Sequence, residues 1–152
     1  MAHIMIADDD ELVAELARDA LYSAGHTCAW VATGERAWEA MQARRPDLLL
    51  LDQHMPGMSG INLLRTLRSS AEFYDLPVIM LTAMTGAEDE SRALFAGAHD
   101  YVRKPFSDAR LRTAVELLLM KRGTNPHMDL SDRMAYDAGL PGYAGSKVKR
   151  YI

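Results

Sequence analysis

The 152-residue sequence has almost no cysteine, no long hydrophobic run and no excess of positive charge. Cys28 is the only cysteine, which excludes an intrachain disulfide framework and suits a reducing cytoplasm. No apolar run approaches the roughly 18 residues of a membrane-spanning helix, and no signal-peptide pattern follows Met1. The net charge of −4 offers no basic surface to a nucleic-acid backbone. We therefore expect a cytoplasmic protein that binds neither membranes nor nucleic acid directly.

The sequence does contain short apolar runs that alternate with longer segments of helical periodicity. This alternation is typical of repeated βαβ units around a parallel sheet. Leu48 to Leu51 are apolar at every position, which favours a central strand covered on both faces. The predicted strands span 2–7, 27–31, 47–51, 78–81 and 99–102. The sequence therefore predicts one α/β domain with a doubly wound (βα)5 fold.

The helices between these strands have recognisable start signals. Side chains that can accept hydrogen bonds from a first helical turn stand at Asp10, Thr33, Ser59 and Ser107. A further helix is predicted at 88–96, closed by Gly97. We expect the first and last helices to bury apolar faces, formed by Leu12, Val13, Leu16 and Ala20, and by Leu111, Val115, Leu118 and Leu119.

The pattern changes after Arg122, where we place the end of the domain. Residues 123–152 hold four of the ten glycines and two of the six prolines. The sequence leaves two interpretations of this segment open: a mobile tail, or a tail docked on this or another subunit. One short helix over 130–138 is also compatible with it, with Asp129 as its cap.

Acidic residues follow two of the predicted strands. Asp8 and Asp9 close the first strand, and Asp52 closes the third. If these strands are neighbours in a doubly wound sheet, the three carboxylates meet at the carboxyl ends of the strands, where such sheets bind ligands. Their mutual repulsion requires either raised pKa values or a hard cation, and ligands with oxygen donors alone favour Mg²⁺. The sequence therefore predicts a magnesium site that contains Asp52.

Two further residues complete a set suited to phosphoryl transfer. Thr82 stands at the end of the fourth predicted strand and Lys104 just past the fifth. A carboxylate that attacks phosphorus needs a metal, a cation opposite the metal and a hydroxyl to hold a third oxygen. Each residue alone is a weak signal, whereas the ordered set at successive strand ends is a strong one.

These residues lie in motifs that resemble the receiver domain of bacterial two-component response regulators. The resemblance covers 2–122 and implies a flavodoxin-like sheet with strand order 2-1-3-4-5. Four stretches carry it: Ile6-Ala7-Asp8-Asp9-Asp10, Leu51-Asp52-Gln53-His54-Met55-Pro56-Gly57-Met58-Ser59-Gly60, Leu81-Thr82-Ala83 and Tyr101-Val102-Arg103-Lys104-Pro105-Phe106.

The resemblance implies that Asp52 accepts a phosphoryl group from a sensor histidine kinase or a phosphotransfer protein. It also implies that the side chains of Asp9 and Asp52 and the backbone carbonyl of His54 bind Mg²⁺, while Asp8 helps through water. Lys104 would pair with the phosphoryl group. The protein would then be a signalling switch whose only chemistry is its own phosphorylation and dephosphorylation.

The resemblance further assigns a switch pair and an output surface. Thr82 would move onto the phosphoryl group and Tyr101 would turn inward, altering the surface of the fourth helix, fifth strand and fifth helix. The Lys104–Pro105 peptide bond would be cis. Bulky His54 and apolar Met84 flank the site, and we expect them to slow hydrolysis of the aspartyl phosphate.

Other functions remain open at this level. The Asp8/Asp10 spacing formally fits the Asp-x-Asp motif of haloacid-dehalogenase-like phosphohydrolases, but the loop at Met55-Pro56-Gly57 does not. A receiver that signals without phosphate usually lacks one of the site residues, and all are present here. We expect a single-domain regulator with a downstream protein target, whose tail acts on those contacts or on homodimerisation, although a receiver cut from a longer protein is the alternative.

Overall fold

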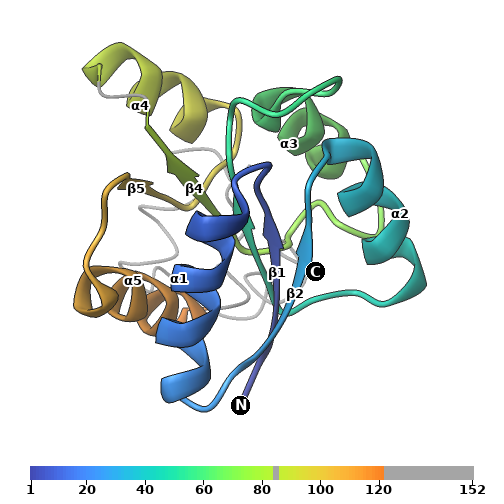
Figure 1. The fold of residues 1–152 in the computed structure, drawn as a ribbon. Helices are drawn as coiled ribbons and strands as arrows, with labels where there is room; N and C mark the ends of the chain where they lie inside the picture. The colour runs from blue at the N-terminus through green and yellow to red at the C-terminus, as the bar shows by residue number, and fades with distance from the viewer. Residues whose placement is uncertain (84–85, 122–152) are drawn as a thin grey trace, which may run out of the picture.

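The computed structural model describes residues 1–83 and 86–121. Five parallel strands alternate with five helices in this part of the chain. Figure 1 shows α1 and α5 together on one side of the sheet, with α2 and α3 on the other. The elements are β1 (His3–Ala7), α1 (Glu11–Ser23), β2 (Thr27–Val31), α2 (Gly34–Ala43), β3 (Leu48–Leu51), α3 (Gly60–Arg68), β4 (Val78–Thr82), α4 (Ala87–Phe95), β5 (Asp100–Arg103) and α5 (Asp108–Met120).

The sheet has the order β2-β1-β3-β4-β5, which confirms the predicted doubly wound (βα)5 fold. All four residues of β3 are buried because this strand is central and has helices on both faces. β2 is an edge strand and is only half-buried along its length. The register pairs Ala7 of β1 with Leu51 of β3, so these two strands end side by side.

The predicted helix starts are confirmed by their capping hydrogen bonds. The Asp10 carboxylate accepts hydrogen bonds from the backbone N–H groups of Leu12 and Val13. At the start of three other helices a side-chain hydroxyl oxygen accepts a hydrogen bond from a backbone N–H of the first turn. These three caps are Thr33, Ser59 and Ser107. Capping residues of this kind satisfy N–H groups that the first turn leaves unpaired. Within the described residues, Gly86 begins α4 without a side-chain cap.

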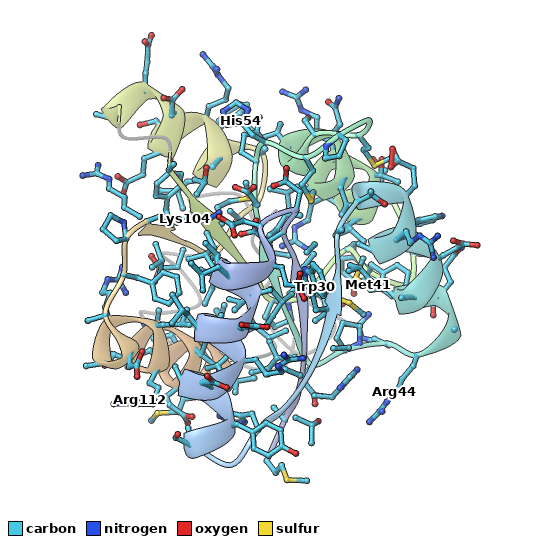
Figure 2. All side chains as sticks on the ribbon, in the orientation of Figure 1. Trp30, Met41, Arg44, His54, Lys104 and Arg112 are labelled. Carbon is cyan, nitrogen blue, oxygen red and sulfur yellow. The ribbon has the colours of Figure 1, made fainter. Side chains whose placement is uncertain are left out.

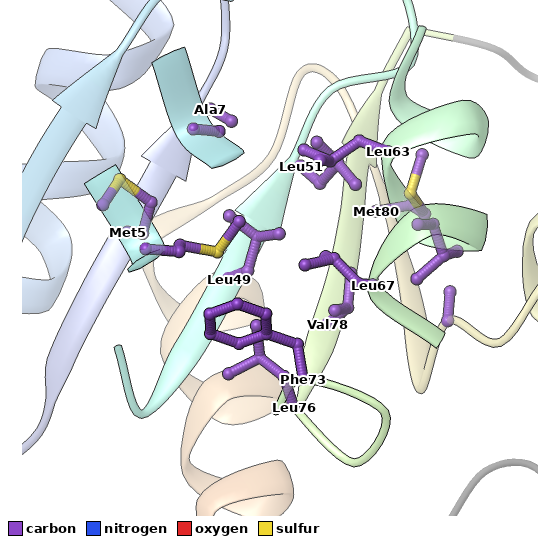
Figure 3. Packing of buried hydrophobic residues seen from close by; sticks show 14 of the residues in the cluster. Met5, Ala7, Leu49, Leu51, Leu63, Leu67, Phe73, Leu76, Val78 and Met80 are labelled. Carbon is purple, nitrogen blue, oxygen red and sulfur yellow. The ribbon is translucent and has the colours of Figure 1, made fainter. Parts of the chain in front are cut away.

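Two apolar clusters cover the two faces of the sheet. Figure 3 shows the first, in which alternate residues of β1, β3 and β4 meet side chains of α3 and the loop after it, among them Leu67, Phe73 and Leu76. The second lies between the opposite face of the sheet and helices α1 and α5, and includes Leu50, Leu111 and Val115. The predicted apolar face of α5 is therefore confirmed.

The predicted face of α1 is wrong in part. Leu12 and Leu16 are 64% and 49% exposed, whereas the buried face is made of Ala14, Ala17, Ala20 and Leu21. Alanines have short side chains that let α1 approach the sheet and α5 closely, so the small residues rather than the large ones face the core. Two leucines are consequently left on the surface near the first turns of the helix.

A buried arginine joins three segments at the opposite end of the sheet. The Arg68 guanidinium, at the last position of α3, donates to the carbonyl oxygen of Gly97 from Nη2 over 2.7 Å and from Nε over 3.0 Å. Nη1 donates to the carbonyl oxygen of Phe73 over 3.2 Å. Burial lowers the pKa of Arg68 to about 10. Arg68 thereby ties the end of α3 to the following loop and to the turn between α4 and β5.

Two predictions concern residues that the structure does not describe. Met84 and the segment 123–152, with its helix at 130–138, lie outside the described residues. Across 1–83 and 86–121, none of the helices combines the length and the apolar character that crossing a bilayer would demand.

Candidate functional site

The carboxyl edge of the sheet brings together the three acidic residues that the sequence singles out. One carboxylate oxygen from each of Asp8, Asp9 and Asp52 lies within 4.8 Å of the others. Asp8 and Asp9 follow β1, and Asp52 follows β3, which is the neighbouring strand. The backbone N–H of Asp52 continues the pairing by donating to the carbonyl oxygen of Ala7 over 2.9 Å. Asp8 and Asp52 are buried while Asp9 is exposed, so the cluster opens to solvent on one side.

Lys104 supplies a cation to this cluster. Its ammonium nitrogen lies 2.6 Å from Asp8 Oδ2 and 3.5 Å from Asp52 Oδ1. The backbone holds Lys104 in place, since its N–H donates to the carbonyl oxygen of Thr82 over 3.0 Å. Figure 2 shows Lys104 and His54 toward the edge of the sheet at which the strands end. The site therefore combines a fixed positive charge with three negative ones.

The loop after Asp52 is held by several short hydrogen bonds. The backbone N–H of Gln53 donates to Asp52 Oδ1 over 2.9 Å, and the Gln53 side chain accepts from the N–H of Ile61 over 2.7 Å. A Cβ atom at Gly60 would overlap the carbonyl oxygen of Asp52, so only glycine fits there. The start of α3 therefore packs directly on the backbone of Asp52.

The far part of the same loop is anchored by α2. Glu35 Oε1 accepts from the backbone N–H of Met58 over 2.7 Å. Gly57 has a φ of 77°, a left-handed conformation that favours glycine, and its Cα faces the Glu35 carboxylate. The sequence alone predicts no role for Gln53, Glu35 or Gly60. The only available signal was their place in or beside the Asp52 motif, because these contacts depend on how the loop folds back.

The electrostatics of the cluster favour a bound cation. Burial, then the neighbouring charge of Asp8, raises the pKa of Asp52 to about 6, while Lys104 and the N–H of Gln53 act in the opposite direction. A hard divalent cation would remove the repulsion that raises this pKa. The three ligand atoms that Asp8, Asp9 and Asp52 offer are carboxylate oxygens, which are donors that Mg²⁺ prefers. The residues present therefore fit a magnesium ion.

Thr82 and Tyr101 lie on adjacent strands beside this cluster. Thr82 is the last residue of β4 and is fully buried, and Tyr101 of β5 is 5% exposed. Burial is the main reason that the pKa of the Tyr101 hydroxyl is raised. Tyr101 also lines a cleft of about 530 Å³ between α4, β5 and α5, whose other walls include Glu90, Arg103 and Arg110. The cleft lies on the surface for which an output role is expected.

The other residues predicted for the site, His54 and Pro105, are exposed. His54 is exposed, two residues after Asp52. The Lys104–Pro105 peptide bond is cis, and Pro105 is exposed. The structure thus places Asp8, Asp9, Asp52 and Lys104 in one cluster, with His54 at its border.

Known proteins match most of the chain. The family model described as the response regulator receiver domain matches residues 4–116. The phosphate regulon transcriptional regulatory protein PhoB of Pseudomonas aeruginosa is 38% identical over 120 residues, or 79% of this chain and 52% of PhoB. The DNA-binding response regulator MtrA of Mycolicibacterium smegmatis is 38% identical over 128 residues, or 84% of this chain and 55% of MtrA. The chain thus spans about half the length of the curated relatives it matches.

A solved structure shows the same likeness in three dimensions. The signal receiver domain of a signal transduction histidine kinase from Syntrophus aciditrophicus superposes with a TM-score of 0.75 and 32% sequence identity. The match covers 86% of this chain and 98% of that one. The likeness therefore extends over that whole receiver domain.

Proposed function

Because the chain belongs to the response regulator receiver domain family, whose members are two-component signalling switches, we propose that Asp52 is its phosphoryl acceptor. The observation that carries this proposal is the position of Lys104, whose ammonium group lies between the carboxylates of Asp8 and Asp52. A cation there can pair with an oxygen of an incoming phosphoryl group. The three clustered carboxylates support a magnesium site beside it.

In this proposal Asp9, Asp52 and the backbone carbonyl of His54 hold Mg²⁺, and Asp8 assists through water. The ion, when bound, neutralises oxygens of the transferring phosphoryl group. A deprotonated oxygen of Asp52 attacks phosphorus as the bond from phosphorus to the donor nitrogen or oxygen breaks. The loop contacts of Gln53 and Gly60 keep the Asp52 backbone fixed during this step.

The same groups provide the switch. The phosphoryl group carries about −1.5 to −2 charges and replaces the single negative charge of the Asp52 carboxylate, and we propose that the Thr82 hydroxyl donates to the new phosphoryl oxygens while Lys104 pairs with them. Tyr101, on the neighbouring strand, couples this change to the surface of α4, β5 and α5. A contact made only in the phosphorylated state is what shifts the population between two conformations. His54 and Met84 slow the loss of phosphate by limiting access of water.

The partners in this proposal are a phosphodonor protein and a downstream protein target. Leu12 and Leu16 are exposed near the first turns of α1, beside the carboxylate edge, and they support docking of an apolar helix of a sensor kinase or phosphotransfer protein. The domain boundaries 2–122, the single-domain organisation, a homodimer and the absence of nucleic-acid binding stay predictions. The relative MtrA is described as DNA-binding.

The geometry does not favour the phosphohydrolase alternative. There the nucleophile would be Asp8, whose carboxylate makes the closer contact with Lys104, at 2.6 Å against 3.5 Å for Asp52. Asp10, the second acidic residue of that motif, accepts the first hydrogen bonds of α1 instead. Asp10 is thus engaged in capping α1 and does not offer its carboxylate for the second role of that motif.

Stoichiometric labelling tests the proposed function. The chain is incubated with acetyl phosphate and Mg²⁺, and its intact mass is measured alongside Asp52→Asn and the control Asp19→Asn, an exposed aspartate of α1. We expect one phosphoryl group on the wild type and the control, and none on Asp52→Asn or in EDTA. Labelling that persists in Asp52→Asn, or repeated turnover of the donor without labelling, would contradict the proposal.

A further inference from the structure

A side chain of the edge strand β2 holds the acidic loop after β1. The indole N–H of Trp30 donates a hydrogen bond from Nε1 to the backbone carbonyl oxygen of Asp8 over 2.7 Å, which is at the short end for an N–H···O bond. The backbone N–H of Asp8 donates to the carbonyl oxygen of Val31 over 3.1 Å. Both backbone polar groups of Asp8 are therefore bound by the same strand.

The carbonyl that Trp30 binds belongs to the peptide unit joining Asp8 to Asp9. A peptide unit is planar, so fixing its carbonyl also fixes its N–H and the position at which the next residue begins. The Asp9 carboxylate is exposed, and in the described part of the chain it makes no hydrogen bond or ion pair. The direction of this carboxylate therefore depends on the backbone that carries it.

We propose that Trp30 is a positioning residue for magnesium binding, whose indole N–H orients the Asp8–Asp9 peptide so that the Asp9 carboxylate faces Asp52. This inference rests on the proposed function, because it takes the three carboxylates as the magnesium site. The Trp30 ring also packs, half-buried, against the apolar cluster under α1 and α5. Phenylalanine at this position would keep one aromatic ring in the cluster and remove the donor together with the second ring, a loss of volume that the same change at Trp38 reproduces.

A matched pair of variants separates positioning from packing. Trp38→Phe is the control, because Trp38 belongs to α2 on the other face of the sheet and packs on Phe73 with ring centroids 5.7 Å apart. Mg²⁺ affinity is measured by isothermal titration calorimetry, and folding by thermal unfolding in EDTA. We expect Trp30→Phe to weaken Mg²⁺ binding about 10-fold, as for other groups that orient metal ligands, and Trp38→Phe to bind like the wild type. Equal affinities of the two variants would overturn the inference.

A second measurement needs no change at Trp30. The chain has two tryptophans, so a ¹⁵N-correlated spectrum gives two indole N–H signals, which Trp38→Phe assigns. Titration with Mg²⁺ should shift the Trp30 signal, because the carbonyl bound to it lies next to the ligand Asp9, and should leave the Trp38 signal in place. A Trp30 signal that is unmoved at saturating Mg²⁺ would overturn the inference.

The experiments distinguish a failure of the role of Trp30 from a failure of the proposed function. If the wild type binds Mg²⁺ and becomes phosphorylated while Trp30→Phe binds equally well, only the role of Trp30 is wrong. If the wild type neither binds Mg²⁺ nor accepts a phosphoryl group, the proposed function is wrong and the role of Trp30 is wrong with it.

Discussion

The ammonium nitrogen of Lys104 lies 2.6 Å from Asp8 Oδ2, closer than it lies to Asp52. Asp8 is almost completely buried and Lys104 largely so. A buried carboxylate that loses its only nearby cation keeps the cost of its desolvation without the compensating attraction. Lys104 is therefore expected to stabilise the fold as well as to serve the proposed phosphoryl transfer.

Replacing Lys104 with glutamine should lower the free energy of unfolding by about 2 kcal/mol in EDTA at neutral pH, because Asp8 and Asp52 then repel one another without a cation. Urea unfolding measures the change. Arg103→Gln is the control, since Arg103 forms a surface ion pair with Glu90 at 2.9 Å and such pairs contribute at most about 1 kcal/mol. Equal losses in the two variants would show that the Lys104–Asp8 contact is not stabilising.

Mg²⁺ should raise the thermal stability of the protein, because a cation bound by the carboxylates of Asp9 and Asp52 in the folded chain shifts the equilibrium away from the unfolded state. At a concentration of 100 times the dissociation constant the gain is about 2.7 kcal/mol. Asp9→Asn should lose most of this gain, whereas Asp19→Asn should keep it. Differential scanning calorimetry with and without EDTA decides the matter, and a gain in Asp9→Asn as large as in wild type would count against the site.

Gly60→Ala should destabilise the protein by about 1–3 kcal/mol, the usual cost of forcing a methyl group into a filled space. The added carbon would overlap the backbone of Asp52, which cannot move without disturbing the sheet. Gly86→Ala is the control, because among the described residues its new carbon would meet the end of the flexible Asp89 side chain at 3.2 Å and no backbone atom. Urea denaturation should separate the two variants, and comparable midpoints would mean that the loop after Asp52 can shift.

Cys28 should react slowly with thiol reagents near neutral pH. Burial raises the pKa of its thiol from 9.0 to about 11, and only the thiolate reacts. The rate of disulfide exchange with Ellman's reagent should therefore rise with pH toward a midpoint near 11 in the folded protein. A rate that reaches its midpoint at the ordinary thiol pKa of 9.0 would contradict this expectation. Cys28→Ala, which has no thiol, gives the background rate.

The same shift has a consequence for stability. The unfolded thiol loses its proton at lower pH than the folded one, so the contribution of Cys28 is complete below pH 9.0 and is lost as the pH rises toward about 11. Cys28→Ala should be less sensitive to pH across this window. Unfolding midpoints of the two proteins at several pH values provide the measurement.

The parts of the fold that could be predicted from sequence are those fixed by short-range signals. The buried run Leu48–Leu51 and the caps at Asp10 and Ser107 depend on a few neighbouring residues, and the structure confirms them. The meeting of Asp8, Asp9 and Asp52 follows from the position of each at the end of a strand together with the order of the strands.

Features that depend on the relative placement of whole elements could not be predicted. Leu12 and Leu16 were expected inside, but close packing of the alanines of α1 turned them outward. The hydrogen bonds from Trp30 to Asp8 and from Met58 to Glu35 join residues 22 and 23 positions apart. Such contacts require a particular side-chain direction on one element and a particular backbone direction on another, and no local pattern encodes both.

The hydrogen bonds of Arg68 to the turn before β5 anchor the carboxyl end of α4. The carboxyl end of the helix is tied through Gly97 to α3, whereas Ala93 is the only buried residue along its length. The amino end lies toward the edge of the sheet that carries Asp52 and Thr82. We expect a change at that edge to displace the amino end of α4, which the exposed Glu90–Arg103 ion pair holds, more than the carboxyl end, which the buried Arg68 holds.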